Sequence, residues 1–549
     1  MEIFNIQNLS FSYPDREPCL SDINFSVKQG EFIVVCGESG CGKTTLLKLL
    51  KPQISPFGKT SGEIKYLGKP LSKTFEEVTA TEIGFVFQNP DNQIVTDKVY
   101  HELAFGLESM GVDTNTIKRK TAEMASFFGI EQWFRQSTDS LSGGQKQLLN
   151  LASVLVMSPK VIILDEPTSQ LDPVASSEFI LTLKRLNEQL GLTVIIVEHR
   201  LEEIFPIADR VIAMENGKIL SIDTPKAVCK SLLGLPMELA LPSATRIFSK
   251  VNGNGEIPVS VKEGRAFINE NYKYKKSDEI VPLKSKKEIT IRLKDVWYRY
   301  QKTTGDVLNG VDLEVNKGEL YCLLGGNGTG KTTVLNVISG LSKAYKGSVI
   351  INNKKLKEYK NNSLYKGALG LLPQNPQSVF IKKTVEEDYK DLLKSIGISD
   401  DKISVTINEM LERLGISHLK SRHPLDISGG EQQKAALGKV LLTSPKILLL
   451  DEPTKGIDAF AKANLGRLLK ELTSLGITVL AVTHDVEFAG EYADKCGLLF
   501  DGEVVSQDVP KRFFPQNRFY TTGSNLIASD VFPDCVTCQQ VVVKCLEQQ

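Results

Sequence analysis

Two stretches of the sequence, GESGCGKT at residues 37–44 and GGNGTGKT at residues 325–332, share the pattern G-x-x-x-x-G-K-[ST] of a phosphate-binding loop. An apolar run precedes each loop, FIVVC at 32–36 and LYCLL at 320–324, and a helix-like run follows it. A strand, a glycine loop and a helix in that order turn backbone N–H groups and a helix N-terminus toward phosphate oxygens. The two stretches therefore predict two nucleotide-binding units.

Further motifs follow both loops at nearly constant spacing, which indicates a duplicated domain. The loop lysines are 288 residues apart (331 − 43), and four later pairs keep offsets of 286, 286, 286 and 285: Gln88 and Gln374, Ser142 and Ser428, Asp165 and Asp451, His199 and His484. We expect a first domain at 1–225, a linker or accessory segment at 226–287, a second domain at 288–515 and a tail at 516–549. Alternating strand and helix patterns predict an α/β fold with a largely parallel sheet in each domain.

The segment between the domains gives weaker signals. Its start, KAVCKSLLGLPMELA, has a helical pattern, and its end, 273–287, is basic. The basic run is either a solvated linker, which we favour, or a contact to phosphates or lipid headgroups. The nine cysteines suit free thiols, and the tail cysteines (Cys535, Cys538 and Cys545) form at most a weak metal pattern.

Composition restricts the classes of function. The chain has 549 residues, and 66 basic residues balance 66 acidic ones, whereas nucleic-acid binders usually carry a basic domain, so no nucleic-acid partner is expected. The N-terminus lacks the basic-then-apolar layout of a secretory signal. No apolar stretch reaches the roughly 18 residues that a membrane-spanning helix needs. Any role at a membrane therefore requires a separate partner.

Each domain carries the residues for nucleotide hydrolysis. Lys43 and Lys331 are expected to reach the β- and γ-phosphates of ATP, and Thr44 and Thr332 to bind Mg²⁺. The strands VIILDEP at 161–167 and ILLLDEP at 447–453 each end in two carboxylates, which alternation places on opposite sides of the strand. We assign Asp165 and Asp451 to Mg²⁺, and we assign Glu166 and Glu452 as general bases for the attacking water.

A second anion-binding motif precedes the acidic strands. LSGGQKQ at 141–147 and ISGGEQQK at 427–434 place Ser-Gly-Gly before an apparent helix, 23 residues ahead of the acidic pair in both domains (165 − 142 and 451 − 428). Exposed N–H groups, a serine hydroxyl and the helix dipole suit a phosphate. Alone, such a motif would be an ordinary helix-capping turn.

The ordered set of phosphate loop, glutamine, SGG motif, LDEP strand and histidine resembles the ATP-binding-cassette (ABC) ATPases over both halves of the chain. The resemblance implies two tandem cassettes, each with a mostly parallel sheet core, an antiparallel β subdomain and a helical subdomain. It also implies a head-to-tail sandwich in which Lys43 shares an ATP with Ser428 and Gly430, and Lys331 shares one with Ser142 and Gly144.

The resemblance assigns further roles residue by residue. Tyr13 and Tyr300 would stack on adenine, with Tyr298 as a rival, and His199 and His484 would contact the γ-phosphate. Gln88 and Gln374 would sense Mg²⁺ and the attacking water, and Asp172 and Asp458 match the loop between cassettes. The nucleotide-binding set is then Tyr13, Gly37, Glu38, Ser39, Gly40, Cys41, Gly42, Lys43, Thr44, Thr45, Ser142, Gly143, Gly144 and Gln145, with Tyr300, Gly325, Gly326, Asn327, Gly328, Thr329, Gly330, Lys331, Thr332, Thr333, Ser428, Gly429, Gly430 and Glu431.

Three residues depart from the common family pattern: Gly326, Ile427 and Glu431. None of them removes a lysine, a magnesium ligand, a general base or a γ-phosphate histidine. We therefore predict two competent ATPase sites with slightly different rates.

The work driven by ATP has two candidate classes, membrane transport and a soluble machine acting on ribosomes or DNA. Residues 87–108, FQNPDNQIVTDKVYHELAFGLE, look like the glutamine-loop region of energy-coupling-factor (ECF) importer ATPases, and 372–388 are a distinct version of it. The tail at 512–528 also resembles fused double ATPases of that group. The resemblance implies a transmembrane scaffold (T-type) subunit, a small substrate-binding (S-type) membrane subunit and a peripheral position on the cytoplasmic face of the membrane. A vitamin, a vitamin precursor or a metal ion would be the cargo.

Overall fold

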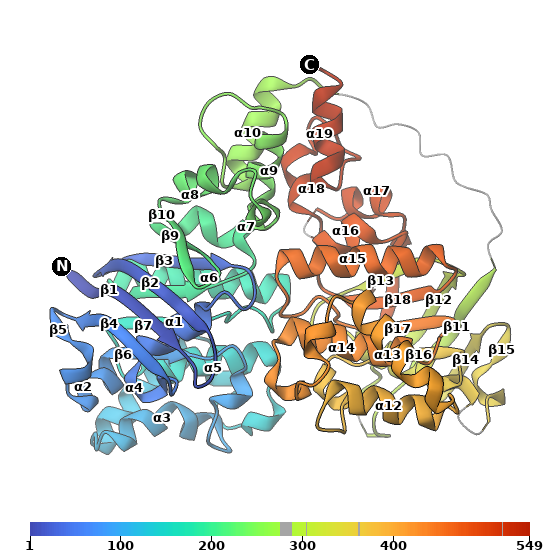
Figure 1. Cartoon of the computed structure of the whole chain (residues 1–549), viewed down its shortest axis with the longest axis horizontal. Coiled ribbons are helices and arrows are strands. Elements are labelled where there is room, and N and C mark those ends of the chain that lie inside the picture. Colours follow the sequence, from blue (N-terminus) through green and yellow to red (C-terminus); the bar gives the residue numbers. More distant parts are fainter. Residues whose placement is uncertain (275–287, 304, 361–362, 519) are drawn as a thin grey trace. The chain divides into compact units, whose positions relative to one another are not determined.

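The computed structural model of the chain describes residues 1–274, 288–303, 305–360, 363–518 and 520–549, and the chain divides into two compact units, Met1–Gly264 and Arg265–Gln549. Both units contain the same pair of sheets, a four-stranded antiparallel sheet and a six-stranded mostly parallel one (Figure 1). The α/β fold with two tandem cassettes is therefore confirmed. Most of the basic run at 273–287 lies outside the described residues.

The strands of the first unit form sheets in the orders β2-β1-β4-β5 and β10-β9-β3-β8-β7-β6. The antiparallel sheet consists of β1 (Glu2–Ser12), β2 (Pro18–Lys28), β4 (Lys59–Tyr66) and β5 (Lys69–Pro70). The core sheet consists of β3 (Phe32–Gly37), β6 (Ile83–Val86), β7 (Val161–Asp165), β8 (Thr193–Val197), β9 (Arg210–Glu215) and β10 (Lys218–Asp223). Only the β9–β10 pair of this core sheet is antiparallel among the described strands.

The second unit repeats this arrangement with the orders β12-β11-β14-β15 and β16-β17-β18-β13-β19-β20. Its antiparallel sheet consists of β11 (Ile289–Tyr298), β12 (Leu308–Asn316), β14 (Lys346–Ile351) and β15 (Lys354–Lys355). Its core sheet consists of β13 (Leu320–Leu324), β16 (Leu369–Leu372), β17 (Ile447–Asp451), β18 (Thr478–Thr483), β19 (Lys495–Phe500) and β20 (Glu503–Asp508). The strands expected before both phosphate loops and both acidic pairs are thus confirmed.

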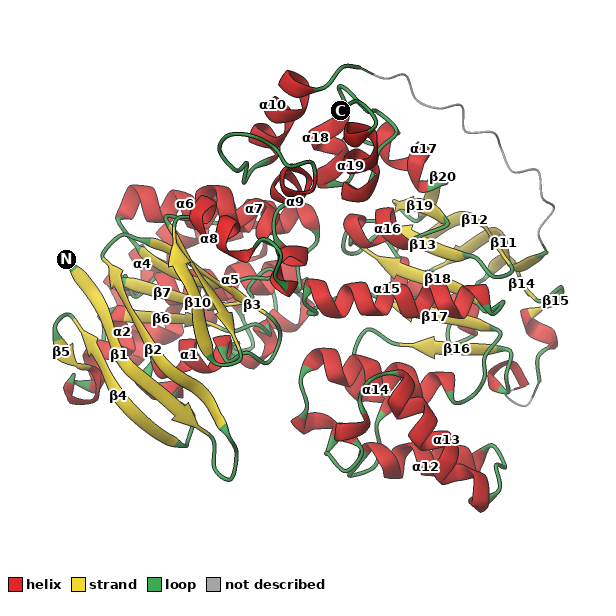
Figure 2. Cartoon of the chain, turned by 45° about the horizontal axis from the view of Figure 1, so that its top comes forward, coloured by secondary structure: helices red, strands yellow, loops and turns green. Residues whose placement is uncertain are grey.

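Helices flank the sheets in both units (Figure 2). The helices that begin in the first unit are α1 (Lys43–Leu49), α2 (Glu76–Glu82), α3 (Val99–Ser109), α4 (Thr114–Phe127), α5 (Gly143–Leu155), α6 (Pro173–Leu190), α7 (Leu201–Ile204), α8 (Pro225–Leu232), α9 (Ser243–Lys250) and α10 (Val261–Asn271). Those of the second are α11 (Lys331–Ser339), α12 (Val385–Ser395), α13 (Asp400–Arg413), α14 (Gly429–Leu441), α15 (Ala459–Ser474), α16 (Val486–Tyr492), α17 (Pro510–Phe513), α18 (Gly523–Ala528) and α19 (Cys538–Leu546).

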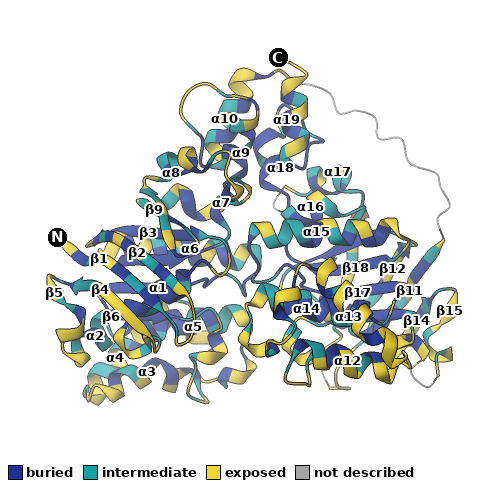
Figure 3. Cartoon of the chain, in the orientation of Figure 1, coloured by how far each residue is buried: buried dark blue, intermediate teal, exposed yellow. Residues whose placement is uncertain are grey.

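Strand alternation builds a core on each face of the parallel sheet. Along β3, Phe32 and Val34 belong to one hydrophobic cluster, which α6 and α8 complete, while Ile33 and Val35 belong to the other, which α1 and the antiparallel sheet complete. The central strands β7 and β8 of the first unit and β13, β17 and β18 of the second are buried along their whole length, whereas the edge strands β10 and β20 are partly exposed (Figure 3). A rigid buried sheet can therefore hold the loops at its strand ends in fixed positions.

The predicted accessory segment at 226–287 is divided between the two units. Val228, Leu232 and Val259 belong to the core of the first unit. Residues after the boundary instead contact the tail: the Arg265 Nε donates to the Leu526 carbonyl at 2.9 Å, and the Tyr272 ring lies 6.3 Å from that of Phe532, centre to centre. The helical pattern expected from residue 226 is present in α8 but is broken before the short 3₁₀ turn at Pro236–Ala240.

Candidate functional site: paired nucleotide-binding loops

Each phosphate loop turns through glycines with positive φ and then enters a helix. Gly42 has φ 97° and Gly330 has φ 100°, and α1 and α11 begin at the lysine that follows each. A Cβ atom at Gly42 would lie 2.9 Å from the carbonyl oxygen of Cys19, and one at Gly330 would lie 3.0 Å from that of Val307. Only glycine fits both the backbone angle and the space, so the loop pattern in the sequence follows from geometry.

The loop lysines are buried and fold back over their own loops. The Nζ of Lys43 donates to the carbonyl oxygens of Gly37 at 2.9 Å and Glu38 at 2.8 Å. The Nζ of Lys331 donates to the carbonyl oxygens of Gly325 and Gly326, both at 2.9 Å. Each ammonium group is thus held by two carbonyl groups of its own loop, where an anion bound in the loop would meet it.

The threonine after each lysine pairs with the first carboxylate of the acidic strand. Thr44 Oγ1 donates to Asp165 Oδ1 at 3.0 Å, and Thr332 Oγ1 donates to Asp451 Oδ1 at 3.1 Å. Burial, helped by the charge of Glu166, raises the pKa of Asp165 to about 6, and burial also raises that of Asp451 to about 6. A hydroxyl beside a buried carboxylate is the oxygen donor set that Mg²⁺ prefers, so these residues fit that ion.

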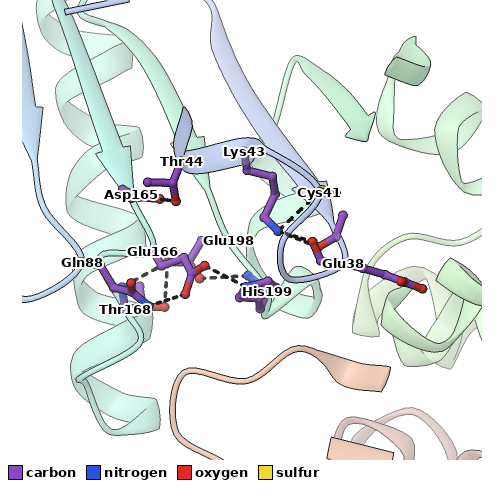
Figure 4. Close-up of polar contacts among 11 residues, drawn as sticks. Glu38, Cys41, Lys43, Thr44, Gln88, Asp165, Glu166, Thr168, Glu198 and His199 are labelled. Atoms are coloured by element: carbon purple, nitrogen blue, oxygen red, sulfur yellow. Dashed lines mark hydrogen bonds and ion pairs between the residues drawn. The ribbon is translucent and has the colours of Figure 1, made fainter. Parts of the chain in front are cut away.

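The second carboxylate of each strand lies in a separate cluster. Glu166 and Glu452 have φ of 45° and 48°, a strained region for residues other than glycine, and such strain often marks functional sites. Glu166 accepts from Gln88 Nε2 at 2.7 Å, and its other oxygen lies 2.8 Å from His199 Nε2 (Figure 4). The structure thus brings these three predicted residues together in one cluster of the first unit.

The corresponding cluster of the second unit has a different composition. Glu452 Oε2 lies 2.9 Å from His484 Nδ1, and Glu452 Oε1 lies 3.5 Å from Lys331 Nζ. Burial opposes ionisation of Glu452, but the hydrogen bond and charge of His484, together with the charge of Lys331, outweigh it and lower the pKa of Glu452. Gln374 is exposed, and among the described residues no hydrogen bond of its side chain to Glu452 is found. Gln374 therefore differs from Gln88, which contacts the carboxylate of its own unit.

The SGG motifs begin α5 and α14 with reciprocal side-chain caps. Ser142 N donates to Gln145 Oε1 at 2.9 Å, and Gln145 N donates to Ser142 Oγ at 3.3 Å. In the second unit the Ser428 N–H and Oγ–H donate to Glu431 Oε2 at 2.9 and 2.7 Å. Glu431, a departure from the family pattern, is thus a functional substitute for glutamine as a cap. Both serines are exposed at the start of a 13-residue helix.

The candidate adenine residues lie beside the loops. Tyr13 Oη lies 3.1 Å from Thr45 Oγ1, and Tyr300 Oη lies 3.1 Å from Thr333 Oγ1. A pocket beside Tyr13 is also lined by Arg16, Phe57 and Lys59. The rival Tyr298 packs against the hydrophobic core of the second unit, whereas Tyr300 is 62% exposed, which favours Tyr300.

The remaining candidates have structural partners. Asp172 and Asp458 cap α6 and α15 by accepting from Ala175 N and Ala461 N. The tail cysteines are free thiols, and the described residues hold no group of three or more His, Cys, Asp or Glu side chains that could bind a metal by itself. In the described part of the chain, no helix combines the length and apolar character needed to cross a bilayer.

Two further members of these clusters, Glu198 and Lys455, have no assigned role in the family motifs. Glu198 is buried beside His199, and burial lowers the pKa of Lys455, which faces Glu452 and Asp451. The only signal in the sequence is a difference between the copies: Glu198 aligns with Thr483, and Lys455 aligns with Ser169. A difference between duplicated positions does not reveal that a side chain is buried.

The chain belongs to the ABC transporter family: the family model for the ABC transporter cassette matches residues 20–169 and 308–455, which contain both sets of motifs. It is therefore an ATPase, with two ABC cassettes in one polypeptide. Among curated proteins, a Bacillus cereus protein provisionally named as an ABC transporter ATP-binding protein is 42% identical over 98% of this chain and 97% of its own length. A similarly named protein of Methanosarcina mazei is 32% identical over 92% of this chain and 88% of its own length.

Among solved structures, cbiO1 from Clostridium perfringens, described as part of the ABC transporter complex cbiONQ, is 29% identical and covers 41% of this chain and 91% of its own, with a TM-score of 0.39.

Proposed function

We propose that this chain is the ATP-hydrolysing subunit of an ECF-type importer and that its two cassettes drive uptake of a vitamin, a vitamin precursor or a metal ion through separate membrane subunits. The observation that carries this proposal is the outer surface of α3, within the segment 87–108 that resembles ECF ATPases. Tyr100 and Phe105 of α3 are 37% and 48% exposed, and Met110, directly after the helix, is 46% exposed, whereas Val99 and Leu103 anchor the helix in the core. Exposed aromatic side chains on a surface helix suit contact with a protein partner.

The equivalent surface of the second cassette supports a partner with two different faces. At the positions of Tyr100 and Phe105, 286 residues later (386 − 100 and 391 − 105), α12 carries Glu386 and Asp391. The buried anchors of α12, Val385 and Tyr389, keep the same helical register. The two cassettes therefore offer an aromatic and a charged surface, as expected for contact with non-equivalent parts of a T-type scaffold that is joined by an S-type subunit.

The site residues divide the chemistry of hydrolysis among them. Lys43 and Lys331 bind the β- and γ-phosphates, and Tyr13 and Tyr300 stack on adenine. Thr44 and Asp165 would hold Mg²⁺ in the first site, Thr332 and Asp451 would hold it in the second, and Gln88 and Gln374 would sense it; when bound, the ion would neutralise charge on the phosphates. Glu166 and Glu452 accept a proton as a water oxygen attacks the γ-phosphorus and the bond to the β-phosphate oxygen breaks. His199 and His484 orient the γ-phosphate.

Coupling to transport follows from shared ligands. The SGG serines, Ser142 and Ser428, complete the site of the opposite cassette, so that binding of two ATP closes the cassettes and hydrolysis lets them open. Residues 1–225 and 288–515 are the two moving cassettes, and the segments after Gln88 and Gln374 pass the movement to the membrane partner. The chain then lies peripherally on the cytoplasmic face of the membrane.

Affinity co-purification of the intact chain from its native membranes tests the proposal. The double variant Tyr100→Glu with Phe105→Asp places the α12 residues on α3, and it should lose an integral-membrane companion at least tenfold while basal ATP turnover stays within twofold. Phe75→Ala, which changes an aromatic residue that is 83% exposed just before α2, is the matched control and should retain the companion. Recovery of ribosomal proteins in place of a membrane companion, or equal loss of turnover and companion, would overturn the proposal.

A further inference from the structure

We propose that Glu198 is a positioning residue of the first ATPase site, which fixes both the turn that carries Glu166 and the loop that carries His199. This inference rests on the proposed catalytic roles of Glu166 and His199. Glu198 ends the run VIIVE directly after β8, and only 3% of its surface is exposed. A buried carboxylate is costly unless hydrogen-bond donors surround it, so its partners indicate its role.

The partners of Glu198 come from both catalytic loops (Figure 4). Glu198 Oε1 accepts from the backbone N–H of Thr168 at 3.1 Å and from its hydroxyl at 2.8 Å. Glu198 Oε2 accepts from the backbone N–H of His199 at 3.3 Å. Thr168 follows Glu166 by two residues, in the turn that holds Glu166 at φ 45°. One carboxylate therefore links the strained turn to the histidine loop.

The second cassette shows what happens without this carboxylate. Thr483 replaces Glu198; its hydroxyl lies 3.3 Å from that of Thr454 and accepts from the backbone N–H of Asp485 at 3.0 Å, so it makes neutral contacts and reaches the backbone N–H of Asp485, not that of His484. The backbone N–H of His484 then donates to Glu452 Oε2 itself, at 3.3 Å. In the first cassette Glu198 accepts the equivalent N–H, and Glu166 Oε2 accepts instead from Gln88. Glu198 thus leaves the catalytic carboxylate free to contact the glutamine loop.

The protonation state of Glu198 gives a readout that a purely structural role would not move. Two titratable side chains face it, Glu166 from the turn after β7 and His199 from its own loop, while β3 supplies the Val35 carbonyl as acceptor for the Glu198 N–H. Burial raises the pKa of Glu198 to about 7; the Thr168 hydrogen bonds and the His199 charge oppose this rise and the Glu166 charge adds to it. All three of its hydrogen-bond partners are donors, so the ionised form fits them and the protonated form does not. First-site turnover should therefore rise as pH increases through about 7.

The experiment compares Glu198→Gln and Glu198→Thr in the full chain by steady-state ATP turnover at pH 6 and pH 8. Glu198→Thr, which introduces the residue of the second copy, should lower kcat about tenfold at pH 8 with the KM for ATP within twofold, because misplacing a catalytic group by a fraction of an ångström costs this much. Glu198→Gln should match the wild type at pH 6 and lack its rise toward pH 8. Both variants are also measured with Glu452→Gln, so that residual turnover reports the first site.

Glu202→Gln is the matched control, since Glu202 is also a buried carboxylate near this loop but accepts from Ser243 N at 2.8 Å. It should keep the wild-type pH profile even where it lowers the melting temperature. Wild-type kcat and pH profile in both Glu198 variants, or the same loss in Glu202→Gln, would overturn the inference. Full turnover in Glu166→Gln would instead overturn the proposed catalytic roles, whatever the Glu198 variants do.

Discussion

The two cassettes share their motifs, and a histidine contacts the proposed catalytic carboxylate in both, but the other charged groups near that carboxylate differ. Glu166 has a second buried carboxylate, Glu198, nearby, whereas Glu452 has two amines, Lys331 at 3.5 Å and Lys455 within electrostatic range. The pKa of Glu452 is lowered by His484 and Lys331 against the effect of burial. A carboxylate with a lowered pKa is a weaker general base, so the lowered pKa of Glu452 should slow proton acceptance at the second site. Duplication thus preserved the reacting groups while their surroundings diverged.

The largest effect is expected from removing the general bases one at a time. Glu166→Gln and Glu452→Gln should each lower turnover at their own site by about 10²-fold or more, the range for loss of general base catalysis. The total loss should be greater for Glu166→Gln, because proton acceptance is expected to be slower at the second site. Phosphate release at saturating ATP measures both.

The same pair of variants can contradict the comparison. If one replacement abolishes turnover and the other leaves it untouched, only one site is catalytic and the prediction of two competent sites is wrong. A larger loss for Glu452→Gln would reverse the inferred order of the two rates. Melting temperatures of both variants serve as the control for folding.

The phosphate-loop glycines give an intermediate effect that also differs between the copies. A Cβ at Gly42 would meet Leu20 Cδ2 at 2.7 Å and Cys19 O at 2.9 Å, whereas the nearest atom to one at Gly330 is Val307 O at 3.0 Å. With similar φ at both, Gly42→Ala should destabilise the chain by about 2 to 3 kcal/mol and Gly330→Ala by less, since backbone strain of this kind costs about 1 to 3 kcal/mol. Thermal melting without ATP measures the loss of stability. Melting with ATP shows whether the substitution at Gly42 also displaces Lys43, because a displaced lysine would weaken the stabilisation by ATP.

Gly68→Ala separates backbone strain from steric clash. Gly68 has φ 78° but open space where a Cβ would lie, so its loss should be about 1 kcal/mol, the cost of the left-handed conformation alone. Equal losses for Gly42→Ala and Gly68→Ala would show that the clash at Gly42 relaxes freely and that the two loops do not differ.

Local patterns in the sequence predicted the fold and most of the site because each motif specifies its own geometry. The glycines required positive φ, the apolar runs before Asp165 and Asp451 required buried strands, and Ser142 with Gln145 required a helix cap. The contacts of Gln374 and Glu198 could not be predicted in this way, because they depend on which donor reaches which carboxylate oxygen across separate loops. The division of segment 226–287 between the two units likewise depends on packing with distant residues, such as Leu526.

The smallest expected effect concerns the helix caps, where Gln145 and Glu431 differ only in charge. Burial opposes ionisation of Glu431, but hydrogen bonds from Ser428, with His418 3.2 Å away, lower its pKa below the usual 4.5. Because the folded pKa is depressed, the stabilisation is present above about pH 4.5 and is lost as pH falls through the lower folded value. Glu431→Gln should therefore lower the free energy of unfolding by about 0.3 to 1 kcal/mol at pH 7, the range for a charge at a helix N-terminus, and by less as the pH falls below 4.

Urea unfolding at pH 7 and at the lowest pH where the chain stays folded measures the difference for Glu431→Gln. The reverse change in the first unit, Gln145→Glu, should raise the free energy of unfolding by a similar amount. If the Glu431→Gln cost were the same at both pH values, the charge would have no part in capping, and the two SGG turns would be equivalent.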